Sequence, residues 1–281
     1  MNTAITDIDT TNEEKILKEY YNHCVEKVAE NNFLVMYAKE KLRHSYQVIG
    51  AGNYILKHEK IFAQSKDNDF LRSAKLAYLF HDIGRFTEIE KHFSSPEQKY
   101  DHSVLSYEIL KTYSEYAKPE ILLPVKHHGH MIGYLYKDAD YQSITDKTLK
   151  EKVEQITFLV RDADKIANFY LLKTAWAKQA PELSLFFYDL PIIRPKQKAF
   201  DQYLNHEMVD RGQETSKGEA LLNYLSWIYD LNYQSSFEFC QRNGVFSIFY
   251  QIIDAYIPDD TDKIKVKKQF EKSIQTTNMK G

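Results

Sequence analysis

The sequence predicts an all-α fold, with a helical core followed by a C-terminal helical extension. Apolar residues recur at spacings of three and four along most of the chain, as they do on one face of a helix. Alternating patterns of the kind that β-strands show are scarce. Only 9 glycines and 7 prolines interrupt the 281 residues, so long helices can form between them. A chain of this length can bury a substantial core.

The first half of the chain contains five predicted helices. Residues 13–30 show the apolar spacing clearly, with Leu17 and Cys24 on one face. Glycine and proline indicate the helix ends, because the third helix stops near Gly84 and Pro119 opens the fifth. The five predicted ranges are 13–30, 32–57, 69–81, 102–113 and 119–128.

The second half begins with a long predicted helix, which ends before Pro181. Its range and those of the three helices after it are 146–179, 197–210, 215–231 and 235–256, and a charged tail follows over 262–277. We expect residues 12–182 to form the core domain and residues 183–281 to form the extension packed on it. The extension would cover a cleft in the core or form the contact of a homodimer.

Composition and charge exclude several classes of protein. The formal net charge of −3 gives no electrostatic footprint for nucleic acid. The chain has only two cysteines, Cys24 and Cys240, which is typical of a reducing cytoplasm. Its N-terminus is polar and unlike a signal peptide, and the most apolar stretch, residues 244–258, is too short to span a membrane. We therefore expect a cytoplasmic protein without a membrane or nucleic-acid partner.

The histidines predict a metal site. Six of the ten lie at or near the ends of predicted helices, and they are His44, His81, His102, His127, His128 and His130. Neutral imidazoles and carboxylates are ligands that zinc, iron and manganese prefer. Asp82 directly follows His81, and neighbours in a helix lie about 100° apart, so both side chains can point into one cleft.

Several motifs, in order, resemble the HD superfamily of metal-dependent phosphohydrolases. They are LRHSYQV at 42–48, LFHDIGRF at 79–86, DHSVLSYEIL at 101–110, VKHHGH at 125–130 and RDADKIAN at 161–168. The superfamily signature is a histidine, a His-Asp pair and an aspartate, each on a separate helix of an all-α core. This chain is most similar to the histidine-rich branch that binds two metal ions. The resemblance covers about residues 33–172 and implies an HD-domain core.

The resemblance also implies two divalent transition-metal ions bridged by Asp82. The ligands of the first ion would be His44, His81, Asp82 and a downstream aspartate. Those of the second would be Asp82, His102 and His128, with His127 as an extra or replacement ligand. A set of histidines and carboxylates accepts iron, manganese, nickel, cobalt or zinc.

The downstream aspartate is either Asp162 or Asp164. The two lie roughly 200° apart on a helix, so they cannot both face the same cleft. Apolar residues flank both at helical spacing, and periodicity alone does not decide between them. Asp164 is preferred because the family usually continues this motif with a basic residue and then leucine or isoleucine, as Lys165 and Ile166 do here.

Several further residues are candidates to bind an anionic substrate. Arg85 lies where family members often carry a basic residue, and its guanidinium could bind a phosphate oxygen or form a salt bridge with Glu88. Lys126 and Lys165 flank the proposed ligands, although solvated lysines are common. The other candidates are His130 and Asn168, and the loops at 86–101 and 129–145 would determine specificity.

These residues together predict a metal-dependent phosphohydrolase. The ions would activate a water molecule that attacks a phosphoester, with Asp82 and Arg85 at the reacting centre, and nucleotides are among the small phosphorylated substrates considered. One alternative is a di-iron oxygenase of the same superfamily, which would need oxygen. The other is a nucleotide-binding module without activity.

Overall fold

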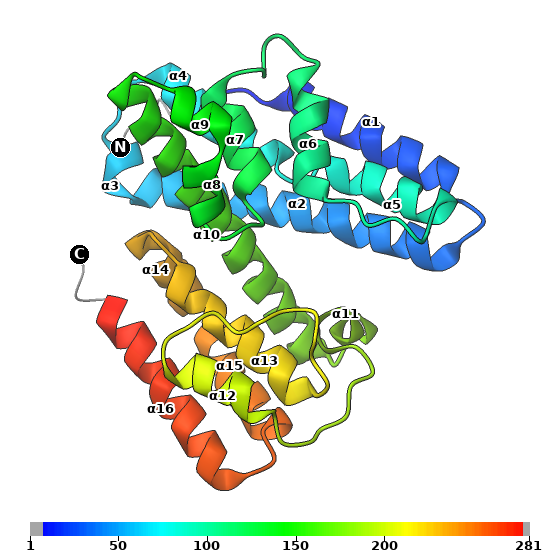
Figure 1. Cartoon of the computed structure of the whole chain (residues 1–281), viewed down its shortest axis with the longest axis vertical. Helices are drawn as coiled ribbons and strands as arrows, with labels where there is room; N and C mark the ends of the chain where they lie inside the picture. The colour runs from blue at the N-terminus through cyan, green and yellow to red at the C-terminus, as the bar shows by residue number, and fades with distance from the viewer. Residues whose placement is uncertain (1–7, 278–281) are drawn as a thin grey trace. The chain divides into compact units, whose positions relative to one another are not determined.

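The computed structural model describes residues 8–277 and is all-α, as the sequence predicts (Figure 1). No β-strand occurs within this range. The helices of the first half are α1 (Thr11–Lys27), α2 (Asn32–His58), α3 (Lys60–Ala63), α4 (Asn68–Phe80), α5 (Gly84–Ser94), α6 (His102–Lys111), α7 (Pro119–His127), α8 (Gly133–Lys137) and α9 (Ala139–Ser143). Those of the second half are α10 (Lys147–Lys178), η2 (Pro181–Leu183), α11 (Ser184–Phe187), α12 (Gln197–Leu204), α13 (Lys217–Ser226), η3 (Trp227–Asp230), α14 (Gln234–Arg242), α15 (Val245–Tyr256) and α16 (Asp260–Thr277).

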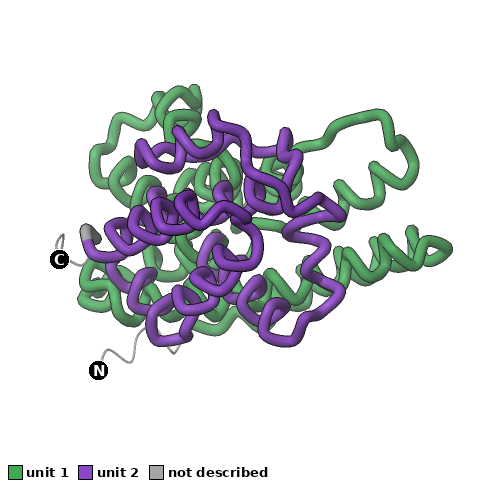
Figure 2. Tube along the Cα trace, turned by 90° about the horizontal axis from the view of Figure 1, so that it is seen from below, with its two compact units in different colours: residues 1–164 green, residues 165–281 purple. Residues whose placement is uncertain are grey.

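The chain divides into two compact units, residues 1–164 and 165–281 (Figure 2). The division lies inside α10, whereas the predicted boundary at residue 182 follows the end of that helix. A division by contacts does not establish which segments fold on their own. The two predicted domains therefore stay a prediction.

Helix α4 is the centre of the first unit. All of its residues from Ser73 to Phe80 are buried, and it packs against α2 and α7. A helix that is buried on every side, as this stretch is, must be surrounded by other elements. The Asp67 carboxylate accepts a hydrogen bond from the Phe70 backbone N–H at 2.9 Å and so caps the start of α4. This buried helix leads directly to His81 and Asp82.

The second unit has an aromatic core around α13 and α15. Helix α15 packs against α13, α14 and α16. The Phe249 ring meets Phe169 edge-on at 5.2 Å between centroids and Phe270 at 5.6 Å. Such edge-to-face pairs are a favoured arrangement of buried aromatic rings. The aromatic residues of this part of the chain are thus accounted for by packing.

Four segments differ from the sequence-based expectation. Helix α5 covers residues 84–94 and so extends into the expected loop at 86–101, and the 129–145 segment contains the short helices α8 and α9. The helix expected at 235–256 breaks at Gly244, which has a φ of +65° that glycine adopts readily. The charged tail is the helix α16, because Val266 and Phe270 give it an apolar face that is buried.

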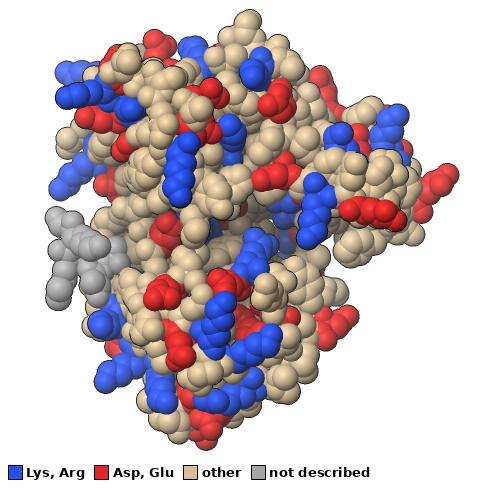
Figure 3. All heavy atoms as spheres, viewed as in Figure 1, with Lys and Arg blue, Asp and Glu red and all other residues tan. Residues whose placement is uncertain are grey.

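The surface mixes charges of both signs. On the face in Figure 3, lysine and arginine side chains alternate with aspartate and glutamate. Within residues 8–277, no helix is long and apolar enough to cross a membrane. Cys24 and Cys240 are both buried, and neither forms a disulfide.

Candidate metal centre

The turn between α4 and α5 carries His81 and Asp82 and is held by close contact with α6. The Gly84 N–H donates to the Ser106 hydroxyl at 2.8 Å, and that hydroxyl donates to the His81 carbonyl at 2.9 Å. A Cβ atom on Gly84 would lie 2.3 Å from the Ser106 nitrogen and 2.5 Å from the His102 carbonyl oxygen. Glycine is needed here because the backbones of α5 and α6 touch. This contact brings His102, the first residue of α6, to Asp82.

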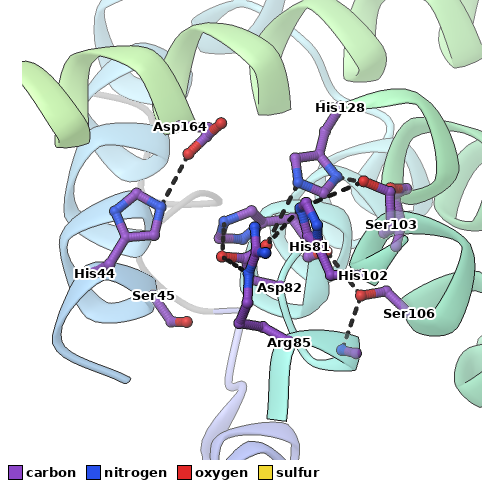
Figure 4. Close-up of polar contacts among 12 residues, drawn as sticks. His44, Ser45, His81, Asp82, Arg85, His102, Ser103, Ser106, His128 and Asp164 are labelled. Carbon is purple, nitrogen blue, oxygen red and sulfur yellow. Dashed lines mark hydrogen bonds and ion pairs between the residues drawn. The ribbon is translucent and has the colours of Figure 1, made fainter. Parts of the chain in front are cut away.

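Imidazoles and carboxylates from five segments meet at this turn (Figure 4). His44 Nε2 lies 2.9 Å from Asp164 Oδ1, so α2 and α10 are in direct contact here. Asp82 Oδ1 lies 3.2 Å from His102 Nε2 and 3.5 Å from His128 Nε2. The His81 ring lies between these two sets, with its centroid 5.6 Å from that of His44 and 5.0 Å from that of His128.

Two overlapping groups of ligand atoms result. One is His44, His81 and Asp164, and the other is His81, Asp82 and His128. Within each group the ligand atoms all lie within 4.8 Å of one another. Two ligands of one ion with bonds of about 2.1 Å are roughly 3 Å apart, which is close to the shortest distances here. The two groups share His81, whereas the sequence predicts Asp82 as the bridging residue.

Backbone carbonyls fix the orientation of two of these imidazoles. His81 Nδ1 donates to the Tyr78 carbonyl at 2.8 Å, and His128 Nδ1 donates to the Val125 carbonyl at 2.7 Å. A carbonyl can only accept, so each neutral ring keeps its Nε2 lone pair free for a further contact. His81 Nε2 is buried and has no hydrogen-bond partner among the described residues. Metal-binding histidines typically show this arrangement, with one nitrogen held by the protein and the other on the ion.

The protonation states suit cation binding. Burial lowers the pKa of His81 to about 4, so its imidazole is neutral at pH 7. Burial alone would raise the pKa of Asp164, but the hydrogen bond from His44 and nearby imidazoles hold it well below its usual value. Burial also opposes ionisation of Asp82, but Arg85 and the neighbouring imidazoles together outweigh it, so the pKa of that carboxyl lies well below the ordinary value. Neutral imidazoles and ionised carboxylates are the forms that bind metal.

His127 and His130 have other partners. His127 Nε2 lies 2.9 Å from Asp138 Oδ2, which also accepts a hydrogen bond from Lys126 Nζ at 2.7 Å. His130 Nε2 lies 2.8 Å from Asp101 Oδ2. The structure therefore brings His128, but not its neighbour His127, to the ligand groups.

Helix α10 contributes Asp164 rather than Asp162 to the ligand groups. Asp162 is fully buried two positions earlier and belongs to neither group. One turn before Asp164, the buried Arg161 donates to the carbonyls of His127 and His128, each at 3.2 Å, and to that of His130. These carbonyls lie at the C-terminal end of α7 and in the turn that follows, so the guanidinium caps this end of the helix and holds the segment of His128.

Of the residues proposed for substrate binding, Arg85 lies beside Asp82, whereas Lys165 and Asn168 belong to the second unit. Arg85 Nη1 pairs with Glu88 at 2.5 Å, and its Nε lies 3.8 Å from Asp82 Oδ2. Lys165 and Asn168 lie on α10 in the second unit, where Lys165 pairs with Asp230 at 2.9 Å. Contact of these side chains with a substrate stays a prediction.

The family comparison covers the segment that carries the ligand groups. Residues 42–168 match the family model described as the HD domain. The chain contains an HD domain. The matched range includes every member of the two ligand groups, so the motif resemblance to the HD superfamily is confirmed. No curated protein and no solved structure matches the chain significantly.

The side chains of this HD domain fit a divalent metal ion. Two groups of three nitrogen and oxygen ligands converge, and His81 Nε2 is a buried acceptor for which the described residues supply no donor. Leaving a buried polar atom unpaired costs about 1–3 kcal/mol, and coordination of an ion would remove that cost.

Sequence reasoning missed Arg161, Asp101 and Asp138. Asp101 accepts a hydrogen bond from the Ser103 N–H at 2.8 Å and caps α6 in front of His102. An aspartate just before a predicted helix is a known cap signal and could have identified it. Arg161 and Asp138 act on partners 31–34 and 11–12 residues away, and no local pattern reports such contacts.

Proposed function

We propose that this HD domain is a metal-dependent phosphohydrolase that cleaves a phosphoester of a small substrate, with nucleotides among the candidates. The observation that carries the proposal is the pair of overlapping ligand groups around His81, whose Nε2 is buried and lacks a hydrogen-bond partner among the described residues. Hydrolytic HD domains use ligands of these types, and the family match covers all of them here.

The chain's own residues would orient the reacting groups. Bound divalent ions would supply an activated water and would offset the charge on the phosphoryl oxygens. Asp82 stays ionised beside His102 and His128, because Arg85 and these imidazoles favour the charged carboxylate. The Ser106 bridge and the Tyr78 carbonyl fix the backbone and ring of His81. The ligand geometry is thus present before substrate arrives, as preorganised catalysis requires.

Arg85 would orient the substrate. Its Nη1 is held by Glu88, while its Nε is buried without a hydrogen-bond partner among the described residues and lies 3.8 Å from Asp82 Oδ2. That distance is too long for a hydrogen bond. The Nε–H is therefore available to a phosphate oxygen placed next to Asp82.

The test is release of inorganic phosphate from a panel of phosphomonoesters and nucleotides by protein loaded separately with Mn²⁺, Fe²⁺, Co²⁺, Ni²⁺ or Zn²⁺. We expect phosphate release with at least one metal, equal in air and under anaerobic conditions, and none after chelation. Turnover that requires iron and oxygen would instead indicate the oxygenase. Nucleotide binding without turnover under every metal would indicate a binding module.

A further inference from the structure

The cations that the sequence proposes for substrate binding already have carboxylate partners. The Nη1 of Arg85 pairs with Glu88, which leaves its Nε for a substrate, and Lys126 pairs with Asp138. Lys165 pairs with Asp230 in the second unit. Withdrawing such a cation to bind substrate would leave a carboxylate unpaired, which is costly where the pair is buried.

Lys41 differs from these three cations. It lies on α2, three residues before His44, so the two side chains occupy the same face one turn apart. No carboxylate within residues 8–277 lies within ion-pair distance of its ammonium. Lys41 Nζ instead lies over the ring of Tyr37, 5.3 Å from its centroid. Two nearby cations on α2 differ from Lys41. Arg43 has a carboxylate partner, Glu40, at 2.5 Å, and Lys39 is exposed rather than half-buried.

His44, one turn after Lys41, places this face of α2 at the candidate metal centre, because its ring centroid lies 5.6 Å from that of His81 and its Nε2 lies 2.9 Å from Asp164 Oδ1. Two electrostatic effects agree with this placement. Burial is the main reason that the pKa of His102 lies well below its ordinary value, and the positive charge of Lys41 contributes to lowering it. Burial opposes the charged form of Arg85, whereas Asp82 and then Tyr37 raise the pKa of its guanidinium. Such effects require proximity, so Lys41 lies within electrostatic reach of His102 and Tyr37 within reach of Arg85.

We propose that Lys41 binds the anionic phosphoryl group of the substrate beside the ligand groups, and that Tyr37 positions its ammonium. This inference rests on the proposed phosphohydrolase function. An ammonium group has three N–H donors. The Tyr37 ring attracts the positive charge of the ammonium but accepts none of these three donors, whereas a carboxylate would. Lys41 is half-buried on α2, so less water competes for those donors than at the exposed Lys39. The subsite favours a phosphate with two negative charges over a neutral group.

The first test measures the affinity of metal-loaded protein for inorganic phosphate by isothermal titration calorimetry. Lys41→Gln should weaken phosphate binding about tenfold, because one charge-assisted hydrogen bond is lost. The metal content should stay unchanged. Lys41→Arg should restore most of the affinity. The matched control is Lys39→Gln, which makes the same charge change two positions earlier on the exposed face of α2 and should leave phosphate affinity unchanged.

The second test addresses Tyr37. Tyr37→Phe keeps the ring and should bind phosphate like the unmodified protein, whereas Tyr37→Leu should weaken binding several-fold. If substrate turnover is found, Lys41→Gln should raise KM more than it lowers kcat. A structural role of Lys41 would instead lower metal content or thermal stability.

The outcomes separate this inference from the proposed function. Phosphate binding that depends on Lys41 in a protein without turnover would support the subsite and contradict the phosphohydrolase. Turnover with equal phosphate affinity in Lys41→Gln and Lys39→Gln would support the enzyme and overturn the subsite. Absence of phosphate binding by the unmodified metal-loaded protein would also overturn the subsite.

Discussion

At the scale of single residues, the orientation of each imidazole depends on the atom that holds its other nitrogen. The Tyr78 and Val125 carbonyls turn the Nε2 atoms of His81 and His128 toward the ligand groups. In His127 the Nε2 atom itself contacts the Asp138 carboxylate, so this ring does not face the ligand groups. His127 and His128 are adjacent in sequence but contact different groups. Only His128 keeps its Nε2 directed at the ligand groups, so only His128 is placed to bind a metal.

The two aspartates of RDAD should behave differently. Asp164→Asn removes a carboxylate that contacts His44 at 2.9 Å, so metal content should fall and activity should be lost. Asp162→Asn changes a buried residue outside the ligand groups, so it should keep its metal and lose about 1 kcal/mol of stability. Elemental analysis and urea unfolding of the two variants make the comparison. Equal metal loss in both variants would contradict the assignment.

At the scale of helices, the sequence predicts the long elements well. The range expected for α2 is 32–57 and the observed helix is Asn32–His58, while α10 was expected at 146–179 and is Lys147–Lys178. Each has many turns of consistent apolar spacing. The prediction is wrong at α5, because the sequence pattern indicates a helix end near Gly84, whereas Gly84 begins a helix. Gly84 is required because α5 and α6 touch at this position. The spacing of apolar residues along one segment cannot reveal a contact with another helix.

The close contact between α5 and α6 predicts the effect of Gly84→Ala. The added Cβ would overlap backbone atoms of α6, so the helices must separate, at a cost of about 3 kcal/mol. His102 would then move away from Asp82, and metal affinity should fall. Urea unfolding and metal titration measure the two effects.

Gly50→Ala is the control for this substitution. Gly50 also lies in a helix, and a Cβ there would meet no atom within 4 Å. Alanine should therefore stabilise the protein by roughly 0.5–1 kcal/mol through the lower entropy of its unfolded chain. Equal effects of the two substitutions would show that the contact at Gly84 is unimportant.

The cap of α4 predicts a dependence of stability on pH. Hydrogen bonds, first from Lys152 and then from the Phe70 N–H, lower the pKa of Asp67. A carboxyl whose pKa is lowered in the folded state stabilises that state above its ordinary pKa, near 4, and loses this contribution as the pH falls below it. Asp67→Ala should thus cost about 1 kcal/mol at pH 7 and progressively less below pH 4.

Asp67→Asn separates the cap from the charge. Asparagine is also a good helix cap, so this variant should lose less stability at pH 7 than Asp67→Ala. The difference between the free energies of unfolding of the Asn variant and the unmodified protein should shrink as the pH falls. A difference that stays constant from pH 7 to pH 3 would contradict the lowered pKa of Asp67.

At the scale of the whole molecule, the ligand groups join distant parts of the first unit. His44 and Asp164 are 120 residues apart in sequence and 2.9 Å apart in space. The motifs predicted which residue types would meet, because the family resemblance fixes their order. Contacts such as that of Arg161 with the end of α7 could not be predicted, because they depend on how separate helices pack.

Metal binding should therefore stabilise the folded chain. A ligand at 100 times its dissociation constant contributes about 2.7 kcal/mol, which corresponds to a rise in Tm of roughly 5 °C for a chain of this size. Far-UV circular dichroism is the suitable measurement, because both tryptophans, Trp176 and Trp227, lie in the second unit and their fluorescence reports on that unit. A chelator should reverse the rise, and Asp164→Asn should reduce it. An unchanged Tm with every metal would contradict binding at these ligands.

The most direct test of the metal-dependent phosphohydrolase is the metal content and phosphate release of the same preparations of unmodified protein and Asp82→Asn. Asparagine keeps the shape of the side chain but removes the charge that faces His102 and His128. We predict that the unmodified protein holds divalent metal and releases phosphate, and that Asp82→Asn loses both together. An Asp82→Asn variant with full metal content and full turnover would contradict the account.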